Sequence, residues 1–272
     1  MGDNGEKYGD EIFSHGDDGE ADPIEKERVD ALAEALDPAS FATLAAVPVG
    51  KDARCLEVGA GTGSVARWLA DRFPKGSVTA TDLDLDLIEE DERPNLRYLR
   101  HDVTSDDFPP SSFDLIHTRF LLPHLPSRDA VLGRMIEWLA PGGWVVLEES
   151  ALFPFESSPH DCFRRTSLGV FTVIAERFGN DSRWARNLPT LIAESGLAEA
   201  SMSAACPPIS AGSAMAGFWR LTIEQLRSEL IELPELSEED VDTALAQFDD
   251  PNFFDLGIAT VTVTARRPPA ST

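Results

Sequence analysis

The stretch that decides the fold is Leu56-Glu57-Val58-Gly59-Ala60-Gly61-Thr62-Gly63, and further along the chain it is followed by Thr79-Ala80-Thr81-Asp82. In the first stretch an apolar strand runs into three glycines on alternate positions, and in the second a strand ends on a carboxylate. Glycine lets the backbone turn tightly and lets a ligand lie almost against the peptide plane. A carboxylate at the end of the neighbouring strand is placed to hold the two hydroxyls of a ribose. The pair predicts a pocket for an adenosine-containing cofactor.

The glycine spacing distinguishes between such cofactors. The dinucleotide fingerprint is G-x-G-x-x-G, which brings a pyrophosphate to a helix N-terminus. Here the spacing is G-x-G-x-G, and Glu57 lies two residues before the first glycine. A carboxylate directed into the loop would repel a pyrophosphate and attract an ammonium or a sulfonium. S-adenosylmethionine carries both cations and no phosphate, so these residues favour it over NAD.

Strand-like and helix-like segments alternate through the middle of the chain. Strands are predicted at 53–58, 77–82, 96–100, 113–118 and 144–149, and helices at 64–73, 83–90 and 127–139. This alternation predicts an α/β fold with a parallel sheet covered on both faces. Ligands of such sheets bind at the carboxyl ends of the strands. Gly59, Asp82, Asp102, Thr118 and Glu149 all fall at those ends.

Four segments follow one another through about residues 50–150: LEVGAGTGSVA, TATDLD, HDVTSDDFPPSSFDLIHTRFLLPHLP and LAPGGWVVLEE. Together they resemble the class I S-adenosylmethionine-dependent methyltransferases. The closest resemblance is to the branch that modifies small molecules, which includes ubiquinone-biosynthesis-type and many natural-product enzymes. It implies a Rossmann-like, seven-stranded and mostly parallel sheet with helices on both faces and helical cap insertions.

The resemblance assigns roles to the glycine loop and the acids beside it. Gly59, Gly61 and Gly63 would line the methionine and sugar portion of S-adenosylmethionine. Glu57 would organise the loop, or reach the amino group of the cofactor through water. Asp82 would hold the ribose hydroxyls.

Further motif residues would complete the cofactor site by the same resemblance. Leu83 would pack on the adenine. Asp102 would accept a hydrogen bond from the adenine amino group, with the amide of Val103 on the ring. Thr118 or Arg119 would offer backbone atoms to the methionine end.

The chain divides into four predicted parts. Residues 1–50 form an N-terminal cap segment, with a loose head at 1–20 and helices at 21–36 and 40–46 separated by Pro38. Residues 51–149 form the cofactor-binding core. Residues 150–182 form a cap insertion with a helix at 160–178. Residues 183–272 complete the core with a helix at 189–195 and strands at 199–204 and 256–264. They also contain a helical insertion at about 205–250, where two helices within 213–247 are broken at Pro234.

The charge and composition of the chain limit which binding partners and compartments can be expected. The net charge of −25, from 23 Lys and Arg against 48 Asp and Glu, repels phosphate backbones and anionic membrane surfaces. The sequence holds no apolar run as long as a membrane span, and its acidic N-terminus has no apolar core of a signal peptide. Three cysteines without C-x-x-C spacing fit a reducing compartment and no zinc site. We expect a cytoplasmic monomer or homodimer without a metal, bound neither to nucleic acid nor to a membrane.

Catalytic residues are few because the methyl carbon of a sulfonium is already activated, so the protein mainly aligns the acceptor and excludes water. His124 follows the fourth strand, where it could face the acceptor or bond local backbone in a turn. Glu149 ends the fifth strand and could hold an amine, take a proton or be a solvated acid. Glu148 should face the other way on that strand. His117 suits a structural role, and Arg119 requires an anionic partner, either Glu57 or the cofactor carboxylate.

The predicted function is methyl transfer from S-adenosylmethionine to oxygen or nitrogen of a small organic acceptor in specialised metabolism. Three alternatives remain open at this point. They are a NAD-type oxidoreductase, a noncatalytic S-adenosylmethionine-binding module and a peptide or protein methyltransferase.

Overall fold

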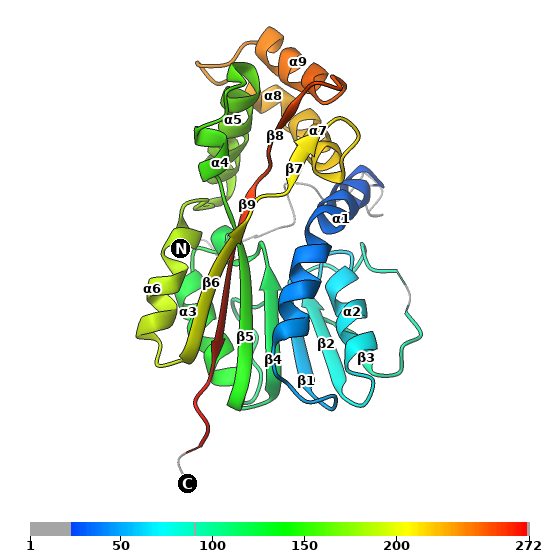
Figure 1. The fold of residues 1–272 in the computed structure, drawn as a ribbon, viewed down its shortest axis with the longest axis vertical. Coiled ribbons are helices and arrows are strands. Elements are labelled where there is room, and N and C mark those ends of the chain that lie inside the picture. The colour runs from blue at the N-terminus through cyan, green and yellow to red at the C-terminus, as the bar shows by residue number, and fades with distance from the viewer. Residues whose placement is uncertain (1–22, 90, 271–272) are drawn as a thin grey trace, which may run out of the picture.

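A computed structural model describes residues 23–89 and 91–270 of the chain. Its centre is a seven-stranded sheet of order β3-β2-β1-β4-β5-β9-β6 (Figure 1). The strands are β1 Arg54–Val58, β2 Ser77–Asp82, β3 Leu96–Arg100, β4 Phe113–Arg119, β5 Leu139–Ala151, β6 Ala198–Ala205 and β9 Ala259–Arg266. Strands β1 to β5 run parallel, and β9 is antiparallel to both β5 and β6. The predicted mostly parallel α/β sheet is confirmed.

The order of the strands places the ligand-binding edge. Strand β1 lies between β2 and β4, so the chain moves to one side of β1 first and to the other side later. In a doubly wound sheet this switch opens a crevice outside the carboxyl ends of the strands. The glycine loop follows β1 directly at that crevice.

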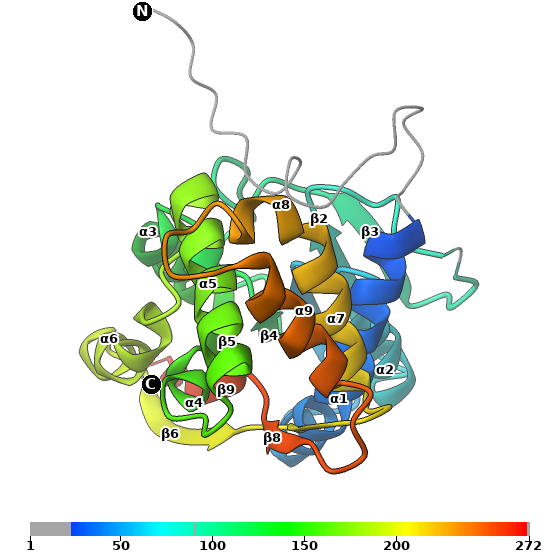
Figure 2. The ribbon, with the colours of Figure 1, turned by 90° about the horizontal axis from the view of Figure 1, so that it is seen from above.

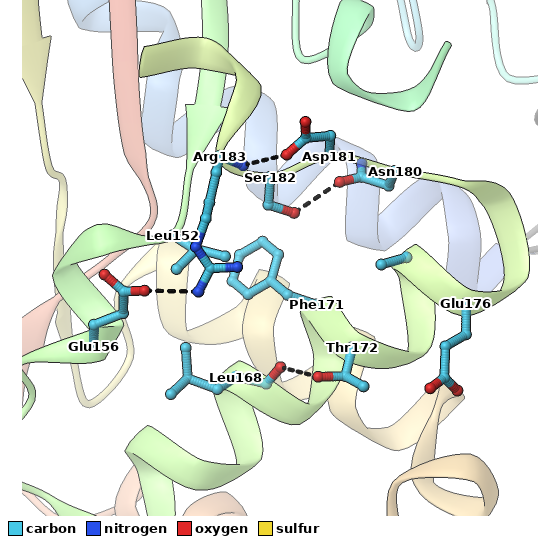
Figure 3. A pocket seen from close by; sticks show the side chains of 11 residues that line it. Leu152, Glu156, Leu168, Phe171, Thr172, Glu176, Asn180, Asp181, Ser182 and Arg183 are labelled. Carbon is cyan, nitrogen blue, oxygen red and sulfur yellow. Dashed lines mark hydrogen bonds and ion pairs between the residues drawn. The ribbon is translucent and has the colours of Figure 1, made fainter. Parts of the chain in front are cut away.

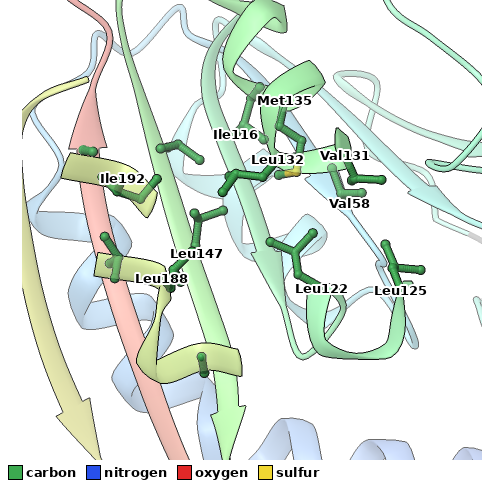
Figure 4. Packing of buried hydrophobic residues seen from close by; sticks show 14 of the residues in the cluster. Val58, Ile116, Leu122, Leu125, Val131, Leu132, Met135, Leu147, Leu188 and Ile192 are labelled. Carbon is green, nitrogen blue, oxygen red and sulfur yellow. The ribbon is translucent and has the colours of Figure 1, made fainter. Parts of the chain in front are cut away.

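Helices cover both faces of the sheet. The side chains of successive residues in each strand point to opposite faces and pack against different helices. On one side α1 (Pro23–Ala46) and α2 (Ser64–Arg72) pack over Cys55, Leu115 and Val146. On the other side α3 (Arg128–Trp138) and α6 (Leu188–Glu194) pack over the residues that alternate with these (Figure 4). Parallel strands buried on both faces read as continuous apolar runs, as they do here.

A second, smaller core lies beyond the carboxyl edge of the sheet (Figures 1 and 2). It is built from α4 (Phe153–Glu156), α5 (Asp161–Phe178), α7 (Ala214–Gln225), α8 (Arg227–Leu230) and α9 (Glu238–Gln247), with a short ribbon of β7 (Pro208–Ser210) and β8 (Phe254–Leu256). Aromatic rings fill it, with Phe155 packed edge-on against Phe163 and Trp219. Helix α1 belongs to both cores, because it packs against α7 above and α2 below.

The structure corrects several predicted boundaries. Helix α1 continues through Pro38, where we predicted a stop, because Leu36, Ser40 and Leu44 form one buried stripe that holds the helix on the molecule. Residues 83–89 contain no helix, since Asp84 Oδ1 accepts the amide of Asp86 at 2.9 Å. Such local bonds compete with helix formation.

Towards the C-terminal end the insertion at 213–247 holds three helices, with a break at Leu226 besides the predicted one near Pro234. The strand predicted at 256–264 is divided by Gly257 into β8 and β9. Strand β5 is longer than predicted at both ends. The loose head predicted at 1–20 lies outside the described residues, and the four-part division of the chain stays a prediction.

Candidate active site

The glycine loop holds three residues in the left-handed backbone region. Gly59, Gly61 and Gly63 have φ of +75°, +54° and +81°, a region that residues with a Cβ rarely adopt. A Cβ at Gly63 would lie 2.8 Å from Tyr98 Oη, and one at Gly61 would lie 3.4 Å from Val29 Cγ1 of α1. Only glycines build this narrow turn, which leaves the peptide planes open to close approach by a ligand.

Asp82 is bound to the loop at the end of β2. Its Oδ2 accepts the amide of Gly61 at 2.8 Å, and its Oδ1 accepts the amide of Leu83 at 2.8 Å. Burial raises the pKa of this carboxyl above its ordinary value, although the amides oppose the effect. The two predicted contacts, loop and ribose-binding acid, therefore lie side by side and fit an adenosine-containing ligand.

The acid after β3 closes a turn. Oδ1 of Asp102 accepts both the amide and the hydroxyl of Thr104, at 2.8 and 2.6 Å, and Oδ2 accepts the hydroxyl of Ser105. Partial burial opposes ionisation, yet these bonds hold the pKa of Asp102 below its usual range. The buried Val103 follows Asp102 in this turn after β3, at the carboxyl edge of the sheet, and the adenine contact of both residues stays a prediction.

Glu57 lies beneath the loop, where its Oε2 is 2.7 Å from His117 Nδ1. His117 Nε2 is 3.2 Å from Glu148 Oε2, and all three side chains are buried. Glu57 is therefore engaged by a histidine of β4, which supports the predicted role in organising the loop. Glu148 and Glu149 do face opposite ways on β5, but neither is solvated.

Arg119 has a different partner from the one predicted. Its guanidinium donates to Asp37 Oδ1 and Ser40 Oγ, each at 2.9 Å, so its bonded anionic partner is Asp37 of α1, while Glu57 interacts with it only through space. Ser40 in turn donates to Glu148, and Ser64 Oγ donates to Asp37 at 3.0 Å. These contacts complete what is called below the buried ionic cluster. Its buried members are Ser40, Glu57, His117 and Glu148, and its partly buried members are Asp37, Ser64 and Arg119.

Thr118, between the two cluster residues of β4, is fully buried on the opposite face. Its hydroxyl has no hydrogen-bond partner among the residues that the structure describes. The side chain therefore contributes nothing visible to the loop, and only its backbone remains a candidate for the methionine end.

Glu149 holds the segment that carries His124. Its two carboxyl oxygens accept the amides of Leu121 and Leu122, at 3.1 and 3.3 Å, at the start of the short helix η1 (Leu122–His124). Burial raises the pKa of Glu149 to about 8, although the two amides oppose this. The carboxyl group thus caps η1 instead of facing solvent.

His124 is held by a residue that the sequence did not reveal. Asn180 Nδ2 lies 2.8 Å from His124 Nδ1, and Ser182 Oγ donates to Asn180 Oδ1 at 2.7 Å. The amide of Asn180 donates to Nδ1, so the hydrogen of the neutral ring resides on Nε2. Burial, reinforced by Arg28 and Arg128, lowers the pKa of His124 to about 4.

A cavity of about 440 Å³ lies beside Asn180, the residue that contacts His124 (Figure 3). Leu152, Leu168 and Phe171 provide apolar walls, and an ion pair of 2.8 Å joins Arg183 to Glu156 across it. Asn180 forms part of its wall. Its volume lies in the range of small-molecule sites.

Sequence reasoning missed Asp37, Ser40 and Asn180. Asp37 and Ser40 lie on either side of Pro38 in α1, where the sequence predicted that the helix would stop. Asn180 follows the C-terminus of α5 and carries no motif. Within the described ranges, no group of three or more His, Cys, Asp or Glu side chains is arranged to hold a metal ion. None of the described helices combines the length and hydropathy that crossing a bilayer requires.

A family model described as a methyltransferase domain matches residues 27–162, half of the chain. The chain belongs to the class I S-adenosylmethionine-dependent methyltransferases. S-adenosylmethionine is the cofactor of this family, and the glycine loop with Asp82 fits it.

Similar proteins support this membership. Methyltransferase str3 of Strobilurus tenacellus is 38% identical over 126 residues, which cover 46% of this chain and 45% of that protein. Trans-aconitate 2-methyltransferase of Deinococcus radiodurans is 31% identical over 110 residues, 39% of this chain and 42% of the relative. The matched region thus spans less than half the length of these relatives.

A solved structure extends the likeness of fold. Phosphoethanolamine N-methyltransferase 2 of Haemonchus contortus, in complex with phosphomonomethylethanolamine and S-adenosylhomocysteine, aligns with a TM-score of 0.57 and 17% identity. The alignment covers 88% of this chain and 57% of the other. Identity at this level shows the fold alone.

Proposed function

We propose that this methyltransferase transfers a methyl group to an oxygen or nitrogen atom of a small organic acceptor in specialised metabolism. The observation that carries the proposal is the left-handed glycine loop bonded through Gly61 to Asp82 at the switch point of the sheet. The fungal and bacterial relatives support a small acceptor, and family membership sets the NAD-type oxidoreductase aside.

The bound cofactor supplies a sulfonium-activated methyl carbon, so the chain has to bind, orient and exclude water. Asp82 and the three glycines bind the nucleoside side. Leu83, Asp102 and Val103 enclose the adenine end, while the backbone of Thr118 and Arg119 limits the methionine end. Each of these contacts is a proposal that follows the family pattern.

His124 is proposed to orient the acceptor. With Nδ1 occupied by Asn180, the neutral ring presents an N–H at Nε2, and an N–H can hold an acceptor oxygen beside the methyl donor. Glu149 is proposed as the positioning residue for this histidine, since both of its oxygens are bonded to the start of η1.

The cavity beside Asn180 is proposed to receive the apolar body of the acceptor. Three apolar walls and the direct Asn180–His124 contact support this placement. Thr172→Trp, which would fill the cavity from α5, should raise the acceptor KM while leaving the affinity for S-adenosylhomocysteine unchanged.

The test is a methylation assay with methyl-labelled S-adenosylmethionine and a panel of phenols, carboxylic acids, amines and peptides. Label transfer to a small molecule, reduced in Asp82→Ala at a cofactor concentration below saturation, supports the proposal. Transfer only to peptides would identify a peptide methyltransferase. Cofactor binding without transfer to any acceptor would favour a noncatalytic binding module, and a chain that does not bind S-adenosylhomocysteine would refute the site itself.

A further inference from the structure

The buried ionic cluster forms hydrogen bonds with residues on both sides of the glycine loop. Glu57 lies two residues before Gly59 and contacts His117, whereas Ser64 follows Gly63 directly and donates to Asp37. The residues between these two contacts, 58–63, form the turn that is proposed to bind the cofactor. The cluster is therefore connected to the loop at its entry and at its exit.

Helix α1 is held over the loop by the same cluster. Asp37 and Ser40 occupy successive turns of the helix and both accept from Arg119 on β4. About two turns earlier, Val29 lies 3.4 Å from the position that a Cβ would take at Gly61. A shift of Asp37 or Ser40 would consequently move the side chain that covers the loop.

His117 joins the two halves of the cluster. Its ring nitrogens lie against one carboxylate on each side, at 2.7 Å from Glu57 and 3.2 Å from Glu148. Ionised carboxylates only accept hydrogen bonds, so both contacts are satisfied together when the ring carries two N–H groups. With both carboxylates ionised, a neutral ring would leave one of them without its bond in a fully buried place, which is costly. Burial raises the pKa of Glu57, and the charge of His117 opposes this rise.

We propose that His117, as an imidazolium between Glu57 and Glu148, is a positioning residue that fixes the glycine loop and α1 in the form that binds S-adenosylmethionine. The proposal rests on the cofactor role of the loop given above. His117 need not touch the cofactor, since it acts through Glu57 on one side and through Glu148 and Ser40 on the other. Loss of its charge should weaken cofactor binding in a folded protein.

The pH dependence of binding follows from the groups around the ring. The charged and titratable groups around it are Glu57 and Cys55 on β1, Glu148 and Glu149 on β5, Arg119 on β4 and Asp37 on α1. Burial lowers the pKa of His117, but the charges and bonds of the two glutamates outweigh it and raise the pKa to about 9. The loss of affinity that is due to His117 should therefore come as the pH rises through about 9, above the pH of about 8 at which Glu149 ionises.

The experiment measures binding of S-adenosylhomocysteine by calorimetry between pH 7 and 10. His117→Gln should bind at least tenfold more weakly than the natural chain at pH 7.5. Glu148→Gln, which removes one flanking charge, should move the alkaline loss of affinity to lower pH by about one unit or more. Ser64→Ala, a milder change at the end of the glycine loop, should weaken binding severalfold. This variant tests the same proposal if His117→Gln does not fold.

The matched control is Asp114→Asn. Asp114 pairs with Arg54 at 2.9 Å and also joins β4 to β1, but at the opposite end of the same strands. The affinity of this variant for S-adenosylhomocysteine should stay within twofold of that of the natural chain. The pH profile of binding should not change, although a small loss of stability is expected. Circular dichroism and melting curves establish that each variant is folded.

The outcomes separate the two proposals. If the natural chain binds while folded His117→Gln or Ser64→Ala binds equally well, or if Glu148→Gln keeps the natural pH profile, the positioning role is overturned and the methyltransferase assignment is untouched. If the natural chain itself fails to bind S-adenosylhomocysteine, the proposed function fails first.

Discussion

Replacing Glu149 by Gln should make the protein relatively more stable as the pH rises. The Glu149 carboxyl is wholly buried, and burial raises its pKa from an ordinary 4.5 to about 8. The folded chain therefore binds more protons than the unfolded chain between these two values. The stability that comes from the neutral carboxyl is complete below pH 4.5 and is lost progressively up to about pH 8.

The magnitude follows from that interval. Converted at about 1.4 kcal/mol for each pH unit, ionising Glu149 in the fold costs up to about 5 kcal/mol. At pH 5 the variant should be less stable by about 1–3 kcal/mol, because the Gln NH2 group faces one of the amides of Leu121 and Leu122 without an acceptor. Towards pH 8.5 the difference should decrease and then reverse in favour of the variant.

Urea unfolding of both proteins from pH 5 to pH 8.5 measures the difference directly. Glu224→Gln provides a control, since Glu224 is exposed on α7 and its replacement should give a difference that does not vary with pH. A Glu149→Gln difference that stayed constant across the range would refute the assignment of a neutral buried carboxyl under η1.

Three further outcomes are expected at the site. Asp82→Ala should weaken S-adenosylhomocysteine binding by about 1–3 kcal/mol, the scale of a lost charge-assisted bond, and unchanged calorimetry would exclude the ribose contact. Gly61→Val should lose binding and lower the melting temperature while the chain still folds, because a β-branched residue is strained at φ +54° and its side chain would meet Val29; retained affinity would show that the loop is not the contact. Asn180→Asp should raise the pKa of His124 from about 4 by about 1–3 pH units by placing a carboxylate 2.8 Å from Nδ1, and a histidine NMR titration that still falls near pH 4 would contradict this geometry.

The sequence predicted the sheet well because its signals are local. The apolar strand before Gly59, the acid at the end of β2 and the turn at Pro141-Gly142-Gly143 each lie within a few residues of the feature they determine. The positions of the strands β1 to β4 therefore agree with prediction within a residue.

The polar contacts of the site were harder to predict because they join distant parts of the chain. Ser40 meets Glu148 across 108 residues, and Asn180 meets His124 across 56. No periodicity in either segment indicates which residue it will face. The helix stop predicted at Pro38 also concealed Asp37, since a proline rule that is sound for an isolated helix is outweighed by the buried stripe of α1.

The place of β9 in the sheet bears on how the chain folds. This strand is the last of the seven in the sequence, yet it lies between β5 and β6 and pairs with both. Until residues 259–266 emerge from the ribosome, the backbone groups along one side of β5 and β6 lack their native partners. We therefore expect closure of the sheet to be a late, slow step, because pairing β9 with β5 joins residues more than a hundred positions apart. Nascent chains halted before that strand would expose open edges prone to aggregation.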